Sequence, residues 1–493
     1  MSHAPQLTIL AIDLFERPVR LRLPFRFGVV TLTECPQAFV RVRVRTGDGR
    51  EATGAAAELM APKWFDKNLA LTNDDNFAQL RGVLAMARDA YLSDTAPATA
   101  FGHFARHHDA HERAAGTRGL NPLLAAYGPA LVDRAILDAL CRALGVPFHA
   151  AVRANLPGIG GAHPAFRDVH PATLFAGTRP AAHIEARHTV GMVDAITAAD
   201  LGTRVDDGLP ETLDEVCARY GHRWFKLKVG GKLDADLARL EAIAGVLDGR
   251  PEPYFASLDG NEQYADAAQV AELLARMRAT PALARLAASI AFVEQPIARA
   301  VALGDTPAAD LRAAGLDLPV IIDESDGPLD AFERARALGY RGVSSKTCKG
   351  VYRSILNAAR CARWNAAAGP GHFFMSGEDL TTQAGLAVQQ DLALVALLGV
   401  GHVERNGHHY VNGMAALPAA EQQAFLEAHP DVYERSHGAV RLRITGGRIA
   451  LGSLDCAGFA SAALPDFDAM APLAPPSPEP PPGPGPDGAR SQH

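Results

Sequence analysis

The sequence lacks several features that would place the protein in a specialised class. Lys and Arg total 48 against 55 Asp and Glu, so the formal net charge is −7 and no basic excess points to nucleic acid or an anionic membrane surface. The six cysteines form no Cys-x-x-Cys pair, which argues against a disulfide scaffold and a zinc ribbon. There is no run of about 20 apolar residues and no basic segment leading into an apolar one. These absences predict a soluble, cytoplasmic protein that does not enter a membrane.

The composition predicts a compact fold with more than one domain. Hydrophobic residues make up 48% and charged residues 21% of the 493 positions, as in ordinary globular chains. Residues 6–45 alternate in short apolar stretches, which is typical of an antiparallel sheet, and residues 75–147 then change to helical spacing. We therefore expect an α+β capping domain over residues 1–150. Residues 151–187, rich in Ala, Pro, His and Gly, are expected to be a linker or an insertion.

From residue 188 the pattern changes to short β runs that alternate with helix-compatible stretches. Eight such runs are found, at 188–193, 224–229, 254–259, 290–294, 320–324, 342–346, 372–378 and 401–404. They predict an α/β fold, a TIM-like (β/α)7β barrel over residues 188–405. An open doubly wound sheet is the alternative, but no Gly-rich phosphate turn follows the early strands. Residues 406–465 are expected to return to the capping domain. Residues 466–493 are expected to be a disordered Pro-rich tail, since 471–493 alone holds nine of the 34 prolines.

Five consecutive β runs, the second to the sixth, end in charged residues. These are Lys226 with Lys228, Asp259, Glu294, Asp323 with Glu324, and Lys346. In a parallel barrel such ends meet at the C-terminal rim, where active sites of this architecture lie. Taken singly, a strand-end acid is often a helix N-cap and a lysine usually lies in solvent. Taken together, three carboxylates in one mouth repel each other unless a cation neutralises them, and all-oxygen ligands suit Mg²⁺.

These residues resemble the enolase superfamily, in particular its muconate-lactonizing and mandelate racemase-like proteins with a Lys-x-Lys motif. The resemblance rests on Lys-Leu-Lys at 226–228, Asp-Gly-Asn at 259–261, Glu-Gln-Pro at 294–296, Asp-Glu-Ser at 323–325, and Lys346. It extends to Leu-Pro-Phe-Arg-Phe at 23–27 and to the helix-compatible run 133–140, and it covers about residues 6–415. Dipeptide epimerases, N-acylamino acid racemases and o-succinylbenzoate synthases are relatives of this kind.

The resemblance implies a metal-dependent enzyme that removes the proton alpha to a carboxylate and forms an enediolate. By this likeness Asp259, Glu294 and Asp323 would bind Mg²⁺, or Mn²⁺. Lys228 and Lys346 would be acid and base on opposite faces of the substrate, and two lysines so placed permit racemisation or epimerisation. Lys226 would position the substrate carboxylate, whose growing charge the metal and an ammonium group stabilise. Lys349 is a weaker competitor for the base on the sixth strand.

The substrate is expected to be a small carboxylate that is amino-acid-like or N-acylated. Arg26 is a candidate for gripping a distal carboxylate, although a plain surface turn explains the same residues. Glu404 and Asn406 lie where the amino-acid and dipeptide epimerases of the family hold an ammonium group, and pairing of Glu404 with Arg405 is the alternative. The remaining candidate substrate-binding residues are Asn261 and Glu324.

Other functions stay open from the sequence. One is a one-base lyase or cycloisomerase of the o-succinylbenzoate synthase or muconate cycloisomerase type. Another is an acid-sugar dehydratase, which would need a late-strand His where this sequence has Lys346. A catalytically silent barrel that acts as a binding module is the alternative from another class. The family is often oligomeric, so a homo-oligomer is one option, but the sequence alone does not determine the oligomeric state. His103, His107 and His111 share one helical face at a spacing that can chelate a metal, although such rows are usually solvated.

Overall fold

The computed structural model describes residues 4–304 and 311–475, and it begins with a long antiparallel sheet. The strands β1 (Leu7–Phe27), β2 (Val30–Thr46) and β3 (Glu51–Leu59) pair in chain order. Val40, Val42 and Val44 are fully buried, because residues two apart on a strand share a face. This sheet packs on the helices α1 (Asn73–Ser93), α2 (Ala100–Gly116) and α3 (Pro122–Leu144). The predicted α+β capping domain is confirmed.

Helix α3 lies close against the sheet. It begins at the side chain of Asn121, which accepts a hydrogen bond from the backbone N–H of Leu124, and it ends at Gly145 in the left-handed conformation. Gly54 in β3 makes the close approach possible, since a Cβ at that position would lie 2.2 Å from the backbone oxygen of Ala135.

Eight parallel strands form the predicted TIM-like barrel. In order around the barrel they are β4 (His183–Val190), β5 (Trp224–Lys228), β6 (Phe255–Asp259), β7 (Ile290–Glu294), β8 (Val320–Ile322), β9 (Gly342–Ser345), β10 (Phe374–Gly377) and β11 (His402–Glu404). Pairing of β11 with β4 closes the barrel. The main helices between the strands are α6 (Leu213–Tyr220), α7 (Leu233–Leu247), α8 (Ala267–Ala279), α9 (Ala284–Ser289), α10 (Arg299–Ala302), α11 (Ala331–Ala337), α12 (Val351–Ala368) and α13 (Leu386–Leu397).

The first barrel strand begins five residues earlier than the sequence predicted. Residues 183–187 belong to β4, not to a linker. The charged Arg187 interrupts the apolar pattern of this strand, so the pattern did not predict its first residues. The Arg187 side chain lies inside the barrel in an ion pair with Glu378. The rest of the predicted linker is structured: α4 (Phe148–Arg153) and α5 (Pro171–Leu174) contact each other, and α5 contacts α12.

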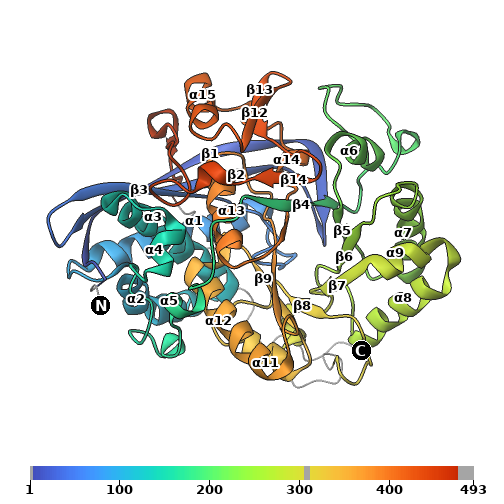
Figure 1. Ribbon diagram of the computed structural model, residues 1–493, viewed down its shortest axis with the longest axis horizontal. Coiled ribbons are helices and arrows are strands. Elements are labelled where there is room, and N and C mark those ends of the chain that lie inside the picture. The colour runs from blue at the N-terminus through green and yellow to red at the C-terminus, as the bar shows by residue number, and fades with distance from the viewer. Residues whose placement is uncertain (1–3, 305–310, 476–493) are drawn as a thin grey trace, which may run out of the picture.

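The C-terminal segment joins the barrel to the capping domain, as Figure 1 shows by the red elements beside the blue sheet. It contains α14 (Gly407–Tyr410), α15 (Ala419–Ala428), β12 (Tyr433–Ser436), β13 (Ala439–Leu442) and β14 (Arg448–Ala450), and β14 extends the barrel sheet beside β4. A buried ion pair between Arg17 and Glu421 links α15 to β1.

Residues 466–475 are ordered, although the sequence predicted a disordered tail from residue 466. Strand β15 (Ala471–Pro472) pairs with β1, and the Phe467 ring lies 5.2 Å from that of Phe15. Aromatic packing and strand pairing thus order residues 466–475 despite their polar neighbours. Residues 476–493 lie outside the described part of the chain.

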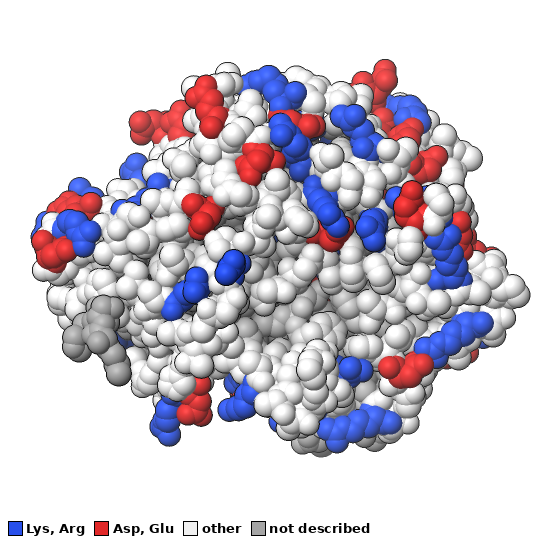
Figure 2. All heavy atoms as spheres, in the orientation of Figure 1, with Lys and Arg blue, Asp and Glu red and all other residues white. Residues whose placement is uncertain are grey.

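The charged side chains form no large patch of one sign on the face that Figure 2 shows, where Lys and Arg are interspersed with Asp and Glu. Among the described residues, no helix is long and apolar enough to cross a membrane.

Candidate active site

Four carboxylates surround the ammonium group of Lys226 at the C-terminal end of the barrel. Its Nζ lies 2.9 Å from Asp259 Oδ2, 2.9 Å from Glu294 Oε2, 2.7 Å from Glu378 Oε2 and 3.0 Å from Glu404 Oε2. All five side chains are at most 1% exposed. Burial disfavours the charge of Lys226, but the four carboxylates raise its pKa well above the usual value.

The same crowding affects the carboxylates. Burial, together with the negative charges of Asp259 and Glu378, raises the pKa of Glu294 well above its usual value. Burial also opposes ionisation of Glu378, but Arg187 and Lys226 hold its pKa below the usual value. Positive charge close to this cluster therefore stabilises the ionised forms of its carboxylates.

Lys228 and Lys346 lie on opposite sides of the barrel mouth. Lys228 ends β5, and its Nζ donates to Asp259 Oδ2 at 2.5 Å. Lys346 follows β9; its Nζ donates to Asp323 Oδ2 at 2.7 Å and lies 4.3 Å from the centroid of the Trp64 ring. Because β5 and β9 are four strands apart in a closed barrel of eight, the two side chains enter from opposite walls.

A pocket lies between these walls. The capping domain covers it with the apolar side chains of Phe25, Phe27 and Trp64. The full lining consists of Phe25, Phe27, Ala61, Trp64, Lys226, Lys228, Asn261, Lys346, Asp379, Leu380, Thr381, Glu404 and Asn406. The lining combines three lysines with the acids Asp379 and Glu404 under an apolar roof, which suits a small ligand with polar groups.

The other predicted site residues divide into those that line the pocket and those that do not. Asn261 lines it and donates its amide to Glu324 Oε1 at 3.1 Å, which places Glu324 behind the lining. Arg26 is exposed outside the lining, since alternation along β1 turns Phe25 and Phe27 inward instead.

Glu404 and Asn406 both line the pocket. Glu404 also accepts a hydrogen bond from Thr189 Oγ1 at 2.5 Å. Its pairing is with Lys226 and not with Arg405, which binds Asp379 and Asp391. Glu404 therefore presents a carboxylate to the pocket, although that carboxylate already has a cation.

Lys349 contacts the back of the cluster. Its Nζ donates to the backbone oxygen of Asp323 at 2.8 Å and to Ser344 Oγ at 2.6 Å, and it is not part of the pocket lining. Of the two lysines that follow β9, Lys346 is therefore the one that faces the pocket.

Glu378 and Trp64 contact the charged cluster but were not among the residues predicted from the sequence. Glu378 directly follows β10 and carried the same strand-end signal as the acids before it. Trp64 lies after β3 with no such signal; its Nε1–H donates to Asp323 Oδ2 at 3.3 Å. Only the packing of the capping domain over the barrel brings it there.

The predicted ligands fit Mg²⁺, but only if Lys226 moves. They are buried carboxylates from the ends of three adjacent strands, and Lys226 is the cation that contacts both Asp259 and Glu294. Lys226 Nζ fills the space between Asp259 and Glu294, and Asp323 pairs with Lys346. Since Lys226 also bonds to Glu378 and Glu404, an ion bound by the three ligands leaves it with two carboxylate partners.

Comparison with known proteins shows which family this chain belongs to. The enolase C-terminal domain-like family model matches residues 209–458, about half of the chain. The chain therefore belongs to the enolase superfamily, in the branch of the mandelate racemases and muconate-lactonizing enzymes. A comparison with curated proteins gives no match.

Solved structures of similar fold come from several members of this superfamily. The muconate lactonizing enzyme from Pseudomonas fluorescens, complexed with muconolactone, is 18% identical with a TM-score of 0.57, and the match covers 94% of this chain and 98% of that one. A dipeptide epimerase from Enterococcus faecalis, complexed with Mg and a dipeptide, is 14% identical with a TM-score of 0.58 and coverage of 92% and 99%. An enolase from Bradyrhizobium, complexed with magnesium and mandelic acid, is 17% identical with a TM-score of 0.56 and coverage of 90% and 93%. At these identities the likeness shows the fold.

Proposed function

We propose that the protein is a Mg²⁺-dependent racemase or epimerase of an amino-acid-like or N-acylated carboxylate. The observation that carries the proposal is that Lys228 and Lys346 face one pocket from opposite walls of the barrel. A substrate held between them exposes one face of its alpha carbon to each lysine. Removal of the proton on one face and delivery on the other inverts the stereocentre.

In the proposed reaction the residues would have separate roles in metal binding and proton transfer. When held by Asp259, Glu294 and Asp323, Mg²⁺ would take up the negative charge that grows on the substrate carboxylate. In one direction Lys228 takes the alpha proton and Lys346 delivers the other. Burial disfavours the charge of Lys346, but Asp323 raises its pKa, which suits it to the donor role.

The roof of the pocket supports the same assignment. Phe25, Phe27 and Trp64 exclude water from the reacting carbon and offer an apolar surface to a substrate side chain. Glu404 and Asn406 lie at the lining where a substrate amine would compete with Lys226 for a carboxylate.

The test uses exchange of the alpha proton with solvent. Enantiopure N-acyl amino acids and dipeptides are incubated with Mg²⁺ in D₂O, and NMR with chiral chromatography follows the label. The wild type is expected to place deuterium in the inverted product. Lys228→Ala should stop exchange from one enantiomer only, and Lys346→Ala should stop it from the other. Lys232→Ala, which changes an exposed lysine in the next loop, is the control and should leave both rates unchanged.

A one-base lyase or cycloisomerase is the second candidate. It is favoured by the tight placement of Lys346 between Asp323 and the Trp64 ring, where its ammonium stabilises charge without moving a proton. In that case Lys228→Ala abolishes exchange from both enantiomers. Failure to exchange any carboxylate in the panel, with equal Mg²⁺ binding by the wild type and Asp259→Asn, would refute both enzymatic assignments and favour the binding module.

A further inference from the structure

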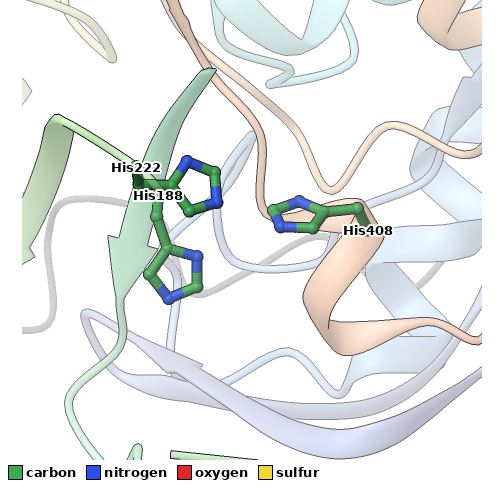
Figure 3. A group of neighbouring side chains, drawn as sticks. All are labelled: His188, His222 and His408. Carbon is green, nitrogen blue, oxygen red and sulfur yellow. The ribbon is translucent and has the colours of Figure 1, made fainter. Parts of the chain in front are cut away.

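Three histidines from separate segments meet on the outer side of the barrel, away from the pocket. They are His188 on β4, His222 just before β5, and His408 in α14 (Figure 3). One ring nitrogen of each lies within 4.8 Å of one from each of the others. His188 points outward because its neighbours Arg187 and Thr189 point into the barrel, toward Glu378 and Glu404.

Each ring of this cluster has a buried nitrogen without a hydrogen-bond partner among the described residues. These are Nδ1 of His188, Nε2 of His222, and one nitrogen of His408, whose ring also interacts with the backbone of Arg405. Buried polar atoms are nearly always satisfied, so this concentration in one place requires an explanation. His408 is itself partly exposed, which gives a ligand a way in.

The chemistry of the rings suits a metal ion. His222 Nδ1 lies 2.9 Å from the backbone oxygen of Ala186, so Nδ1 carries the proton and Nε2 offers a lone pair to the cluster. Burial lowers the pKa of His222 to about 4 and those of His188 and His408 well below the usual value, which leaves neutral imidazoles.

A second group of potential ligands in the described residues is already satisfied. In the group of His108, Asp109 and His163, His163 Nε2 lies 3.1 Å from Asp109 Oδ1, and His163 Nδ1 accepts a hydrogen bond from the backbone of Ala165. The row at His103 and His111 also binds backbone oxygens, those of Leu7 and Ala125. Among the described residues, only the cluster of His188, His222 and His408 combines convergence with unused nitrogens.

We propose that His188, His222 and His408 bind one transition-metal ion of the Zn²⁺ class, which holds the seam between β4 and the segment after β11. Three imidazoles without a carboxylate select Zn²⁺, Co²⁺, Ni²⁺ or Cu²⁺ over Mg²⁺. In a tetrahedral Zn²⁺ site the nitrogens lie about 3.3 Å apart, from bonds of about 2.0–2.1 Å. The present ring nitrogens lie within 4.8 Å of one another, so metal binding requires the rings to come closer together. The site is separate from the Mg²⁺ ligands and does not depend on the proposed reaction.

The experiment titrates chelator-treated full-length protein with ZnCl₂ in the presence of excess Mg²⁺, by calorimetry and metal analysis. His222→Asn is the first variant, since the amide of Asn can keep the hydrogen bond to Ala186. His408→Gln is the second, and His163→Asn is the matched control at the other group. Thermal unfolding is followed with and without Zn²⁺, and Co²⁺ is added to the wild type to record its visible spectrum.

The wild type and His163→Asn are each expected to bind one equivalent of Zn²⁺ with similar affinity. His222→Asn and His408→Gln are expected to bind it at least tenfold more weakly. Zn²⁺ should raise the Tm of the wild type and of His163→Asn, but not that of the other two. Co²⁺ should give the intense visible bands of a tetrahedral site. The proposal is overturned if the wild type binds no Zn²⁺, if His222→Asn and His408→Gln titrate like the wild type, or if the Co²⁺ spectrum is that of a hydrated ion.

Discussion

Replacing Lys226 by methionine tests the electrostatics of the site. The substitution keeps most of the side-chain volume and removes a cation that contacts four buried carboxylates at 2.7–3.0 Å. At an effective dielectric constant of about 20, each such contact corresponds to about 5–6 kcal/mol of Coulomb energy. Desolvation of the charges offsets most of this sum, and removal of one partner from a buried pair costs about 3–5 kcal/mol. We expect a loss of that size in the free energy of unfolding at pH 7 without Mg²⁺.

Addition of Mg²⁺ should recover part of the loss, because an ion between Asp259 and Glu294 replaces the missing charge. At one hundred times the dissociation constant, a bound ion stabilises the folded state by about 2.7 kcal/mol. The assay is urea unfolding followed by tryptophan fluorescence at increasing Mg²⁺. The control is Arg17→Met, which breaks the buried pair with Glu421 in the capping domain. Mg²⁺ should stabilise Lys226→Met more than Arg17→Met. Equal responses, or a Lys226→Met variant within about 1 kcal/mol of the wild type, would refute the reasoning.

Three further outcomes follow from the contacts. Burial raises the pKa of Asp133 to about 8, so from about pH 4 to that value the folded chain keeps a proton that the unfolded chain has lost. Stability should therefore fall as pH rises, by about 1.4 kcal/mol per pH unit, and Asp133→Asn should remove this slope in urea unfolding between pH 5 and 8. Gly54→Ala places a Cβ 2.2 Å from a backbone oxygen of α3 and should lower the free energy of unfolding by about 1–3 kcal/mol or more, whereas Gly116→Ala, in open space, should not. Trp64→Ala removes the ring beside Lys346 and should lower kcat/KM about 2- to 30-fold, with most of the loss recovered in Trp64→Phe.

The sequence by itself determined the barrel and the positions of its charged residues along the chain. Strand and helix periodicity is local, and β6, β7 and β8 lie within a few residues of the predicted runs that end in Asp259, Glu294 and Asp323. Parallel strands in a closed barrel place such residues at one rim whatever the details of packing. That is why a set of candidate site residues could be predicted without coordinates.

The tertiary structure alone decided which groups meet. The capping domain brings Trp64 to Asp323, and this contact depends on how that domain lies over the barrel. The histidine row visible at His103 and His111 binds backbone oxygens, while the cluster with unused nitrogens gathers from segments far apart in the chain. Periodicity tells which face of an element a residue occupies, but contacts between elements depend on barrel closure and domain docking, which no local pattern encodes.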